Sequence, residues 1–232
     1  MKKRIAFVHN AMWEMYNFRG ELLQELKAKG YEITVICPPD EKNAHYFTDL
    51  GIKLLTVPMS RKGTNIKEDV QLVKNLFKVY KKEKFDLVFH YTIKPNIYGT
   101  LAAKLAGIKS IAITTGLGYV FLHNNITSLI AKFMYKFSLA FANEVWFLND
   151  DDMNIFLDKD LITERQALKL PSEGINTKRF VPKEKNRKDS KTVFLMIARV
   201  LYDKGFNEYL EAAKLIKAQR NDVEFQLLGA ID

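Results

Sequence analysis

The stretch that decides the fold is NIKEDVQLVKNLFKVYKKEKFDLVFHYTIKPNIYGTLAAKLAGIKSIAIT, at positions 65–114. It opens with Asn65 followed by Glu68, a spacing typical of the capping box that begins a helix. Apolar side chains then recur at steps of three and four, at Ile66, Val70, Val73, Phe77 and Tyr80. Short apolar runs follow at 86–89 and 110–114, separated by a second helical pattern. The stretch therefore predicts helix, strand, helix and strand in alternation.

The same alternation extends to both ends of the chain. The second helical pattern, after Pro95, carries Ile97, Leu101 and Leu105, and another at Asp203–Gln219 carries Phe206, Leu210, Ala213 and Ile216. Nine apolar runs are predicted as strands: Arg4–His9, Glu32–Cys37, Lys53–Val57, Asp86–Phe89, Ser110–Thr114, Glu144–Leu148, Ala167–Leu170, Thr192–Ile197 and Glu224–Leu228. Several are apolar on both faces, as in strands covered by helices on both sides. This pattern predicts an α/β fold with a doubly wound parallel sheet.

A polar, charged run at 182–191 divides the chain. It contains almost nothing to bury, so we interpret it as a linker between a first domain at 1–181 and the start of a second domain at 192–232. The second part is predicted to hold one strand, one helix and one strand. Such a unit has two open sheet edges and an uncovered face, and a unit of roughly 40 residues rarely folds alone. We therefore expect the second domain to be incomplete in this chain.

Composition sets the broad class of protein. The 232 residues are 47% hydrophobic and 27% charged, which is ordinary for a globular protein with a packed core. The single cysteine, Cys37, lies in an apolar run, so no disulfide within the chain is possible and a core position is predicted. Neither a signal peptide nor a run of about 20 apolar residues is present. A cytoplasmic protein is predicted, free or resting on the inner face of the plasma membrane.

Charge and missing motifs narrow the function classes. The net charge of +9 favours an anionic partner such as nucleic acid, anionic lipid or a phosphorylated substrate, although the lysines can also simply solvate helix faces. No nucleic-acid motif occurs, so nucleic acid is not predicted. The loop after the first strand lacks the G-x-G-x-x-G of a NAD site, and no Walker-type loop or Gly-x-Ser-x-Gly elbow exists. No Cys or His cluster has metal-ligand spacing, so no metal is predicted.

Four segments follow predicted strands, and the carboxyl ends of parallel strands are where open α/β sheets bind ligands. In the segment 198–205, Arg199 and Lys204 lie beside a helix start. Two cations and the N–H groups of a helix start suit a diphosphate, which they would also stabilise as a leaving group. The alternative is two solvated charges on a loop.

The other three segments are weaker when taken singly. In the segment 171–180, Gly174 permits a tight turn and Asn176 can cap it. In the segments 90–99 and 114–121, Lys94 suits an acceptor phosphate, and Gly116 and Gly118 permit close approach of the backbone to a substrate. The alternatives are that the glycines serve turns and that Lys94 is a surface charge at a helix start.

Together the four segments resemble the family 4 retaining glycosyltransferases of GT-B fold, in the group that builds capsule, O-antigen and N-glycan-pathway saccharides. In that family an Ala/Gly-Arg…Lys-Gly segment opens the C-terminal domain, and Arg199 and Lys204 match its pair of donor-diphosphate ligands. Gly174-Ile175-Asn176…Arg179-Phe180 matches the segment that ends the N-terminal domain. The loops at 94–99 and 115–121 look like those of the same group, so the resemblance covers essentially the whole chain.

The resemblance implies a function for each part. The first domain is expected to bind the acceptor, a lipid-diphosphate-linked saccharide. The second is expected to bind a nucleotide-sugar co-substrate, such as a UDP-sugar, with neither metal nor other cofactor. A hexosyl group is transferred between the domains with retention, in bacterial surface polysaccharide synthesis.

The sequence departs from the family pattern in two ways. Many members carry a His near the reaction centre, where this chain has Leu117, so no catalytic residue is assigned. The acidic signature and the final helix of the family's second domain are absent from the sequence. By itself the chain is therefore expected to lack transfer activity, as a fragment or as the product of an interrupted gene.

Further candidates lie near the predicted ligand edge. Contact with the acceptor or the diphosphate cleft is predicted for Asn10, Arg19, His90 and Asn96. Trp13 and Tyr16 either line an acceptor pocket or pack the first loop. Surface or loop positions are predicted for His9, His45 and His123.

The segment 126–142 combines Ile130, Phe133, Met134, Phe137 and Phe141 with Lys132 and Lys136. This mixture predicts either a helix lying on an anionic membrane surface or a buried core helix.

Two other functions remain open. One is a UDP-sugar epimerase of GT-B fold, which requires carboxylates and histidines in its cleft that four scattered histidines do not obviously supply. The other is a non-catalytic module that binds a saccharide or an acceptor.

Overall fold

A computed structural model describes residues 2–60, 63, 65–117, 121, 125–182, 191–200 and 202–229. The chain forms two compact units, Met1–Asn176 and Thr177–Asp232. Most of the predicted linker, 183–190, lies outside the described residues.

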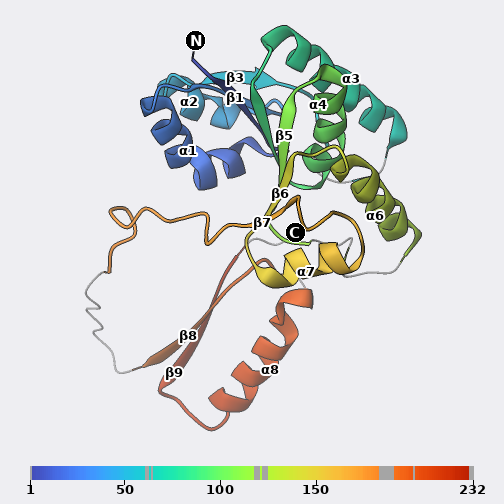
Figure 1. Cartoon of the computed structure of the whole chain (residues 1–232). Helices are drawn as coiled ribbons and strands as arrows, with labels where there is room; N and C mark the ends of the chain where they lie inside the picture. The colour runs from blue at the N-terminus through green and yellow to red at the C-terminus, as the bar shows by residue number, and fades with distance from the viewer. Residues whose placement is uncertain are drawn as a thin grey trace. The chain divides into compact units, whose positions relative to one another are not determined.

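The first unit is built on a seven-stranded sheet in the order β3-β2-β1-β4-β5-β6-β7, with every neighbouring pair parallel (Figure 1). The strands are β1 (Arg4–Val8), β2 (Glu32–Cys37), β3 (Lys53–Thr56), β4 (Leu87–Tyr91), β5 (Lys109–Thr114), β6 (Glu144–Phe147) and β7 (Ala167–Lys169). All seven were predicted, with ends that differ by no more than two residues. The predicted parallel α/β sheet is confirmed.

Helices cover both faces of this sheet (Figure 1). On one face, α1 (Met12–Ala28) and α2 (Glu41–Asp49) bury Met15, Leu23 and Phe47 against β1 and β2. The other face is covered by α3 (Ile66–Glu83), α4 (Thr100–Ala106), α6 (Ile126–Leu139) and α7 (Asp150–Asp158). Cys37 is buried, as predicted. Among the described residues, no helix has the length and apolar character needed to cross a membrane.

The buried face of α3 only partly coincides with the predicted one. The helix begins as predicted, because Asn65 accepts a hydrogen bond from the Lys67 N–H at 3.1 Å and donates to Glu68 at 2.8 Å. Its buried residues, however, are Asp69, Leu72, Leu76, Tyr80 and Glu83. Ile66 and Val70 are exposed. Tyr80 is buried as predicted, and Val73 and Phe77 pack half-buried against the core. Apolar residues occur on more than one side of this helix, so periodicity found part of the buried face but not its centre at Leu72 and Leu76.

A π-helix, η1 (Pro95–Gly99), leads into α4 and changes the phase of the second helical pattern. A π-turn holds one more residue than an α-turn, so side chains beyond it rotate relative to those before it. Ile97 is buried as predicted, but Leu105 is exposed, and Ala102 and Ala103 take the buried positions.

The second unit contains β8 (Thr192–Ile197), η2 (Tyr202–Lys204), α8 (Phe206–Lys217) and β9 (Val223–Leu228), with β8 parallel to β9. The Phe194 and Phe225 rings stack at 4.8 Å, and Tyr209 of α8 packs on Phe225 at 5.7 Å. On the predicted inner face of α8, Ala213 is buried and Leu210 is exposed. The sheet also exposes five large apolar side chains: Phe194, Leu195, Ile197, Leu227 and Leu228.

Candidate functional site

The order of the strands in the first unit reverses between β1 and β4. The connection from β1 leads toward β2 and β3, whereas β4 continues toward β5, β6 and β7. In open α/β sheets, ligands bind outside the carboxyl ends of the strands at such a reversal. Here those ends carry His9 and Asn10 after β1, and Tyr91 and Thr92 at the end of β4.

His9 lies in the loop after β1, one of the two predicted locations, but its side chain is buried at this edge, not exposed at the surface. Its Nδ1 accepts a hydrogen bond from the Ala11 N–H at 2.9 Å, and its Nε2 lies 3.7 Å from a carboxylate oxygen of Glu14. Its ring lies 6.1 Å from that of Tyr91. His9 therefore holds the first turn after β1, and sequence reasoning missed it because the partners are set by that turn.

Arg19 is buried beside Tyr91. Its guanidinium carbon lies 4.7 Å from the centre of the Tyr91 ring, and an Nη donates to the Phe18 carbonyl at 3.1 Å. A second Nη pairs with the carboxylate of Glu173. Burial raises the pKa of the Tyr91 hydroxyl to about 12, so it stays protonated at neutral pH. The predicted cleft residue Arg19 thus lies at the edge, but its charge is already paired.

The segment after β7 is attached to α1. Gly174 adopts a left-handed φ of 77°, which favours glycine, and its N–H donates to the Ser172 hydroxyl at 2.9 Å. The Asn176 side chain donates to a carboxylate oxygen of Glu21 at 2.6 Å, so its bond reaches α1. With the Arg19–Glu173 pair, this contact fixes Gly174 and Asn176 beside the first helix.

Asn10 lines a hollow of about 310 Å³ at the carboxyl ends of β1 and β2. Its wall is formed by Asn10, Ala11, Met12, Trp13, Glu14, Pro38, Pro39, Asp40 and Met59. Trp13 is half exposed there. Tyr16 instead stacks on Tyr46 at 3.9 Å, so it packs α1 against α2. Of the two aromatic candidates, only Trp13 faces this hollow.

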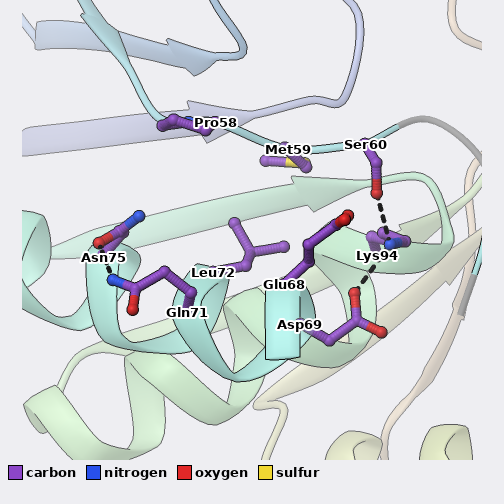
Figure 2. Close-up of a pocket in the computed structure, with 9 residues that line it drawn as sticks. All are labelled: Pro58, Met59, Ser60, Glu68, Asp69, Gln71, Leu72, Asn75 and Lys94. Atoms are coloured by element: carbon purple, nitrogen blue, oxygen red, sulfur yellow. Dashed lines mark hydrogen bonds and ion pairs between the residues drawn. The ribbon is translucent and has the colours of Figure 1, made fainter. Parts of the chain in front are cut away.

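Lys94 lines a neighbouring hollow of about 210 Å³ (Figure 2), which shares Met59 with the first. Its ammonium donates to the Ser60 hydroxyl at 2.7 Å and to a carboxylate oxygen of Asp69 at 2.8 Å. The other oxygen of Asp69 accepts a hydrogen bond from Tyr98 at 2.8 Å. Lys94 is therefore a buried, paired cation, not a surface charge at a helix start.

His90 cannot contact an acceptor in this structure, contrary to the prediction, because its side chain is fully buried. Nε2 lies 2.9 Å from the Tyr80 hydroxyl, and Nδ1 lies 3.3 Å from that of Thr100. A Cβ at Gly99 would lie 2.6 Å from the ring, so the glycine makes room for it. Burial lowers the pKa of His90 to about 3 and keeps the ring neutral. His90 points to the α3–α4 side of the sheet, since side chains alternate along a strand.

Asn96 is also buried, and its Nδ2 donates to the Ile113 carbonyl at 3.0 Å, which attaches η1 to β5. Three buried oxygens in this region have no hydrogen-bond partner within the described part of the chain: Thr92 Oγ1, Asn96 Oδ1 and Thr114 Oγ1. Thr92 also has a left-handed φ of 70°, which is uncommon for a β-branched residue. Unpaired polar atoms and strain of this kind cluster at ligand sites.

Gly116 lies just beyond β5 with a φ of 144°, and a Cβ there would meet no atom within 4 Å. The position therefore requires glycine for its backbone conformation, while the space beside it stays open. Gly118 lies outside the described residues, as does His123.

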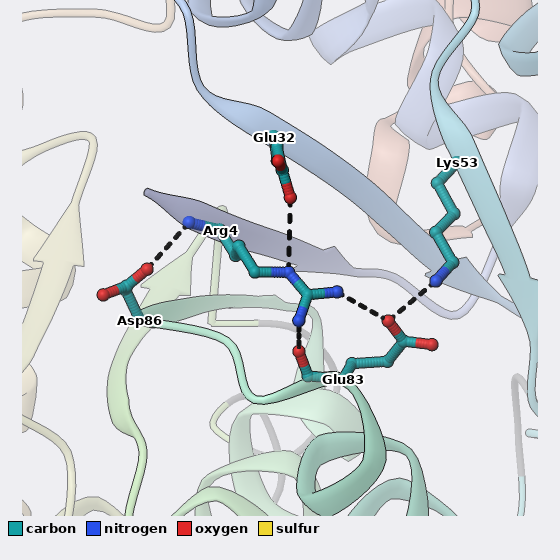
Figure 3. A network of polar contacts seen from close by, with 5 residues as sticks. All are labelled: Arg4, Glu32, Lys53, Glu83 and Asp86. Atoms are coloured by element: carbon teal, nitrogen blue, oxygen red, sulfur yellow. Dashed lines mark hydrogen bonds and ion pairs between the residues drawn. The ribbon is translucent and has the colours of Figure 1, made fainter. Parts of the chain in front are cut away.

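The opposite edge of the sheet carries an ionic network with a structural role (Figure 3). Glu83 accepts from Arg4 at 2.9 Å and from Lys53 at 2.7 Å, and the Arg4 backbone N–H donates to Asp86 at 2.8 Å. The hydrogen bond from Lys53 holds the pKa of the Glu83 carboxyl below its usual range. The network connects β1, β3 and the end of α3 at the edge away from the hollows.

In the second unit, Arg199 and Lys204 lie where the sequence places them, after β8 and before α8. Both are exposed, and Lys204 belongs to η2. Gly205, with a left-handed φ of 74°, precedes the first turn of α8. A Cβ at Gly229 would lie 1.8 Å from the Ala198 carbonyl oxygen, so the loops after β8 and β9 approach closely there. Sequence reasoning missed Gly229, because only the pairing of β8 with β9 brings it beside Ala198.

Residues 4–149 match the family model of the glycosyl transferase 4-like proteins. The chain belongs to this family. Two curated relatives of this glycosyl transferase 4-like chain are transferases. An N,N'-diacetylbacillosaminyl-diphospho-undecaprenol alpha-1,3-N-acetylgalactosaminyltransferase of Campylobacter jejuni is 32% identical over 99% of the chain. A UDP-Gal:alpha-D-GlcNAc-diphosphoundecaprenol alpha-1,3-galactosyltransferase of Escherichia coli is 26% identical over 80% of it. The chain spans 64% and 50% of their respective lengths.

Solved structures share the fold of this glycosyl transferase 4-like chain. Anabaena HepE, in complex with UDP and glucose, has a TM-score of 0.70 at 15% identity, over 98% of the chain and 61% of HepE. A UDP-N-acetylglucosamine 2-epimerase has a TM-score of 0.67, also at 15% identity, over 97% of the chain and 63% of the epimerase. These likenesses identify a GT-B-type fold, which transferases and epimerases share. The family model and the curated relatives favour the transferase over the epimerase.

Proposed function

We propose that the whole protein transfers a sugar from a UDP-sugar to a saccharide carried on a lipid diphosphate, at the inner face of the plasma membrane, in the synthesis of a bacterial surface polysaccharide. One observation carries the proposal. In a chain of the glycosyl transferase 4-like family, Arg199 and Lys204 lie between the carboxyl end of a parallel strand and the first turn of a helix. Both curated relatives are named for acceptors on a diphospho-undecaprenol carrier.

The donor side has the chemistry that a diphosphate leaving group needs. Transfer breaks the bond between the sugar and the distal phosphate of the UDP-sugar, and the departing UDP gains negative charge. Two cations and the N-terminal amides of α8 would stabilise that charge more strongly in the transition state than in the ground state. The close approach of the loops at Ala198 and Gly229 would hold Arg199 in place. No metal or other cofactor is required by this proposal.

The acceptor side is the carboxyl edge of the first unit, with its two adjoining hollows. Asn10, Gly116 and Gly174 are its accessible candidates for contact with the saccharide. Arg19, Lys94 and Asn96 are buried and paired, and Asn176 bonds Glu21. We propose that these four position the edge, so their loss would alter acceptor affinity by disturbing the loops they support.

The experiment is a transfer assay with the whole protein. Radiolabelled UDP-sugars are offered with an undecaprenyl-diphosphate saccharide, and label is counted in the lipid extract. Arg199→Ala and Lys204→Ala should each lower kcat/KM by roughly 100-fold, because each removes a preorganised positive charge from the leaving group. Lys214→Ala, an exposed lysine in the last turn of α8, is the matched control and should leave the rate unchanged.

Three outcomes would contradict the proposal. Unchanged transfer in both variants would remove the diphosphate role of Arg199 and Lys204. Conversion or release of the sugar without an acceptor would indicate the epimerase. Acceptor binding with no binding of UDP at all would indicate a non-catalytic module.

A further inference from the structure

Helix α6 exposes an unusually apolar stripe to solvent. Four side chains at positions typical of one helical face are more than half exposed: Ile126, Ile130, Phe133 and Phe137, at 77%, 57%, 69% and 51%. Leu129 borders the stripe at 60%, and Phe141, just beyond the helix, extends it through a 5.6 Å edge-to-face contact with Phe137. Figure 1 shows α6, in olive, beside α4 in the same helix layer.

The opposite side of α6 already makes the contacts that the fold needs. Tyr135 and Leu139 are buried against β6 and α7, in the cluster that contains Phe147 and Phe156. The exposed stripe is therefore additional to the core. A monomeric protein that keeps its apolar groups inside rarely exposes six large apolar side chains in one patch, and such patches mark contact surfaces.

The charged side chains of α6 itself have one sign. Lys132 and Lys136 lie along its border, and no Asp or Glu occurs within Ile126–Leu139. Lys104 of α4 adds a third ammonium, 5.5 Å from the centre of the Phe141 ring. An apolar stripe bordered by lysines is the pattern of a helix lying in the headgroup region of an anionic bilayer. The aliphatic stems of lysine can lie along the apolar surface while the ammonium groups reach lipid phosphates.

We infer that α6 is the membrane-docking surface of this protein and that its partner is an anionic phospholipid bilayer. The inference rests on the proposed function, since an acceptor on a lipid diphosphate must be reached at a membrane. A second copy of the chain fits less well, because a two-fold contact would bring equal sets of lysines together. The cores of protein interfaces are also depleted in lysine.

The test is flotation of the purified chain with vesicles of phosphatidylcholine alone or mixed equally with phosphatidylglycerol. The chain should float with the anionic vesicles, and salt should weaken the binding. Ile130→Ser combined with Phe133→Ser should lower the partition coefficient about tenfold or more, because two buried apolar anchors are lost. Lys136→Gln should reduce the preference for phosphatidylglycerol. Ile66→Ser combined with Val70→Ser, on exposed positions of α3, is the matched control and should bind as the wild type does.

A second measurement does not depend on how the double variant folds. Leu129→Cys, labelled with an environment-sensitive dye, should shift to the blue with anionic vesicles, whereas Ile66→Cys should not. The absence of flotation, or equal flotation of the α6 and α3 double variants, would overturn the inference. So would a dimer of the free chain that Ile130→Ser with Phe133→Ser turns into a monomer. Donor chemistry at Arg199 and Lys204, assayed with detergent-solubilised acceptor, would be unaffected by any of these results.

Discussion

The two units of the chain contain strands of similar apolar character in different surroundings. In β1, Arg4–Val8, every residue after the first is buried, whereas β8, Thr192–Ile197, has no buried residue. Both are short apolar runs that pair in parallel with a neighbour. The difference is the number of elements around them, because β1 lies between β2 and β4 under helices on both faces. The comparison shows that a local pattern specifies a strand, while neighbours determine how much stability it gains from burial.

The largest expected effect is on the exchange of backbone amides. Peptides from β8 should exchange roughly 1,000-fold faster or more than peptides from β1, because opening a two-stranded unit exposes far less apolar surface than unfolding the seven-stranded one. Hydrogen–deuterium exchange with mass spectrometry measures both in one sample. Equal protection of the two strands would show that β8 gains as much stability from its surroundings as β1 does.

The second-largest difference between the two units should appear in the unfolding free energy lost when one phenylalanine in each is truncated. Phe147 is fully buried and packs on Phe156 at 5.1 Å, so Phe147→Ala should cost about 3–5 kcal/mol of unfolding free energy. Phe194 is 40% exposed, so its side chain buries less apolar area on folding, and Phe194→Ala should lower the unfolding free energy by only about 1 kcal/mol. Urea denaturation of the chain measures both, with Phe147→Leu as the control that keeps most of the volume. A larger loss for Phe194→Ala would reverse the assignment of the stable unit.

The pH dependence of stability should come partly from His90. Its folded pKa, about 3, lies below its unfolded value near 6.5, so below 6.5 the unfolded chain binds a proton that the folded chain excludes. The stability due to its neutral ring is present above pH 6.5 and is lost as pH falls toward 3, at about 1.4 kcal/mol per pH unit.

This dependence can be isolated with a variant. Between pH 6 and 4.5, His90→Gln should reduce the slope of unfolding free energy against pH by about 1.4 kcal/mol per pH unit, the value for one proton taken up on unfolding. Denaturation curves recorded at several pH values measure this slope. His45→Gln, at an exposed position of α2, is the control and should retain the wild-type slope. An unchanged slope in His90→Gln would show that the ring is not excluded from water. Within the described residues of the second unit, no titratable side chain is buried, so no similar contribution is expected from it.

The smallest effect concerns ion pairs. Glu83→Gln should lower stability by about 1 kcal/mol, because a nearly buried carboxylate loses its bonds to Arg4 and Lys53. Since the folded pKa of Glu83 is lowered, its contribution is present above the usual carboxyl pKa and disappears as pH falls through the folded value. In the second unit, Asp222→Asn breaks a fully exposed pair with Arg220 and should give no measurable change in thermal melting. If Asp222→Asn lowered stability as much as Glu83→Gln does, burial of the carboxylate would not explain the difference between the two ion pairs.

The sequence predicted the elements better than the faces they bury. All nine strands and their parallel direction follow from short apolar runs between helices, because the period of two and the need for a crossover are local properties. The centre of the buried face of α3 and the phase of α4 do not follow. Leu72 and Ile66 are equally apolar, and which of them meets the sheet depends on where α3 lies.

For the candidate site, the sequence identified the edge but not the state of its residues. Loops after parallel strands must share one edge, which places Asn10, Gly116 and Gly174 at that edge by topology alone. The burial of His90 and the pairing of Lys94 with Asp69 depend on contacts between β4, η1 and α3. No sequence signal marked those contacts, because the partners lie on separate elements whose packing is decided by shape.

By itself, then, the sequence determined the α/β class, the order of elements, the segment that carries Arg199 and Lys204, and the apolar, basic character of 126–142. Only the tertiary structure decided that His90 and Lys94 are buried, that Gly229 approaches Ala198, and that α6 keeps its apolar stripe outside. The physical reason is that local patterns set backbone conformation and available side chains, whereas burial depends on what the remainder of the chain places opposite each face.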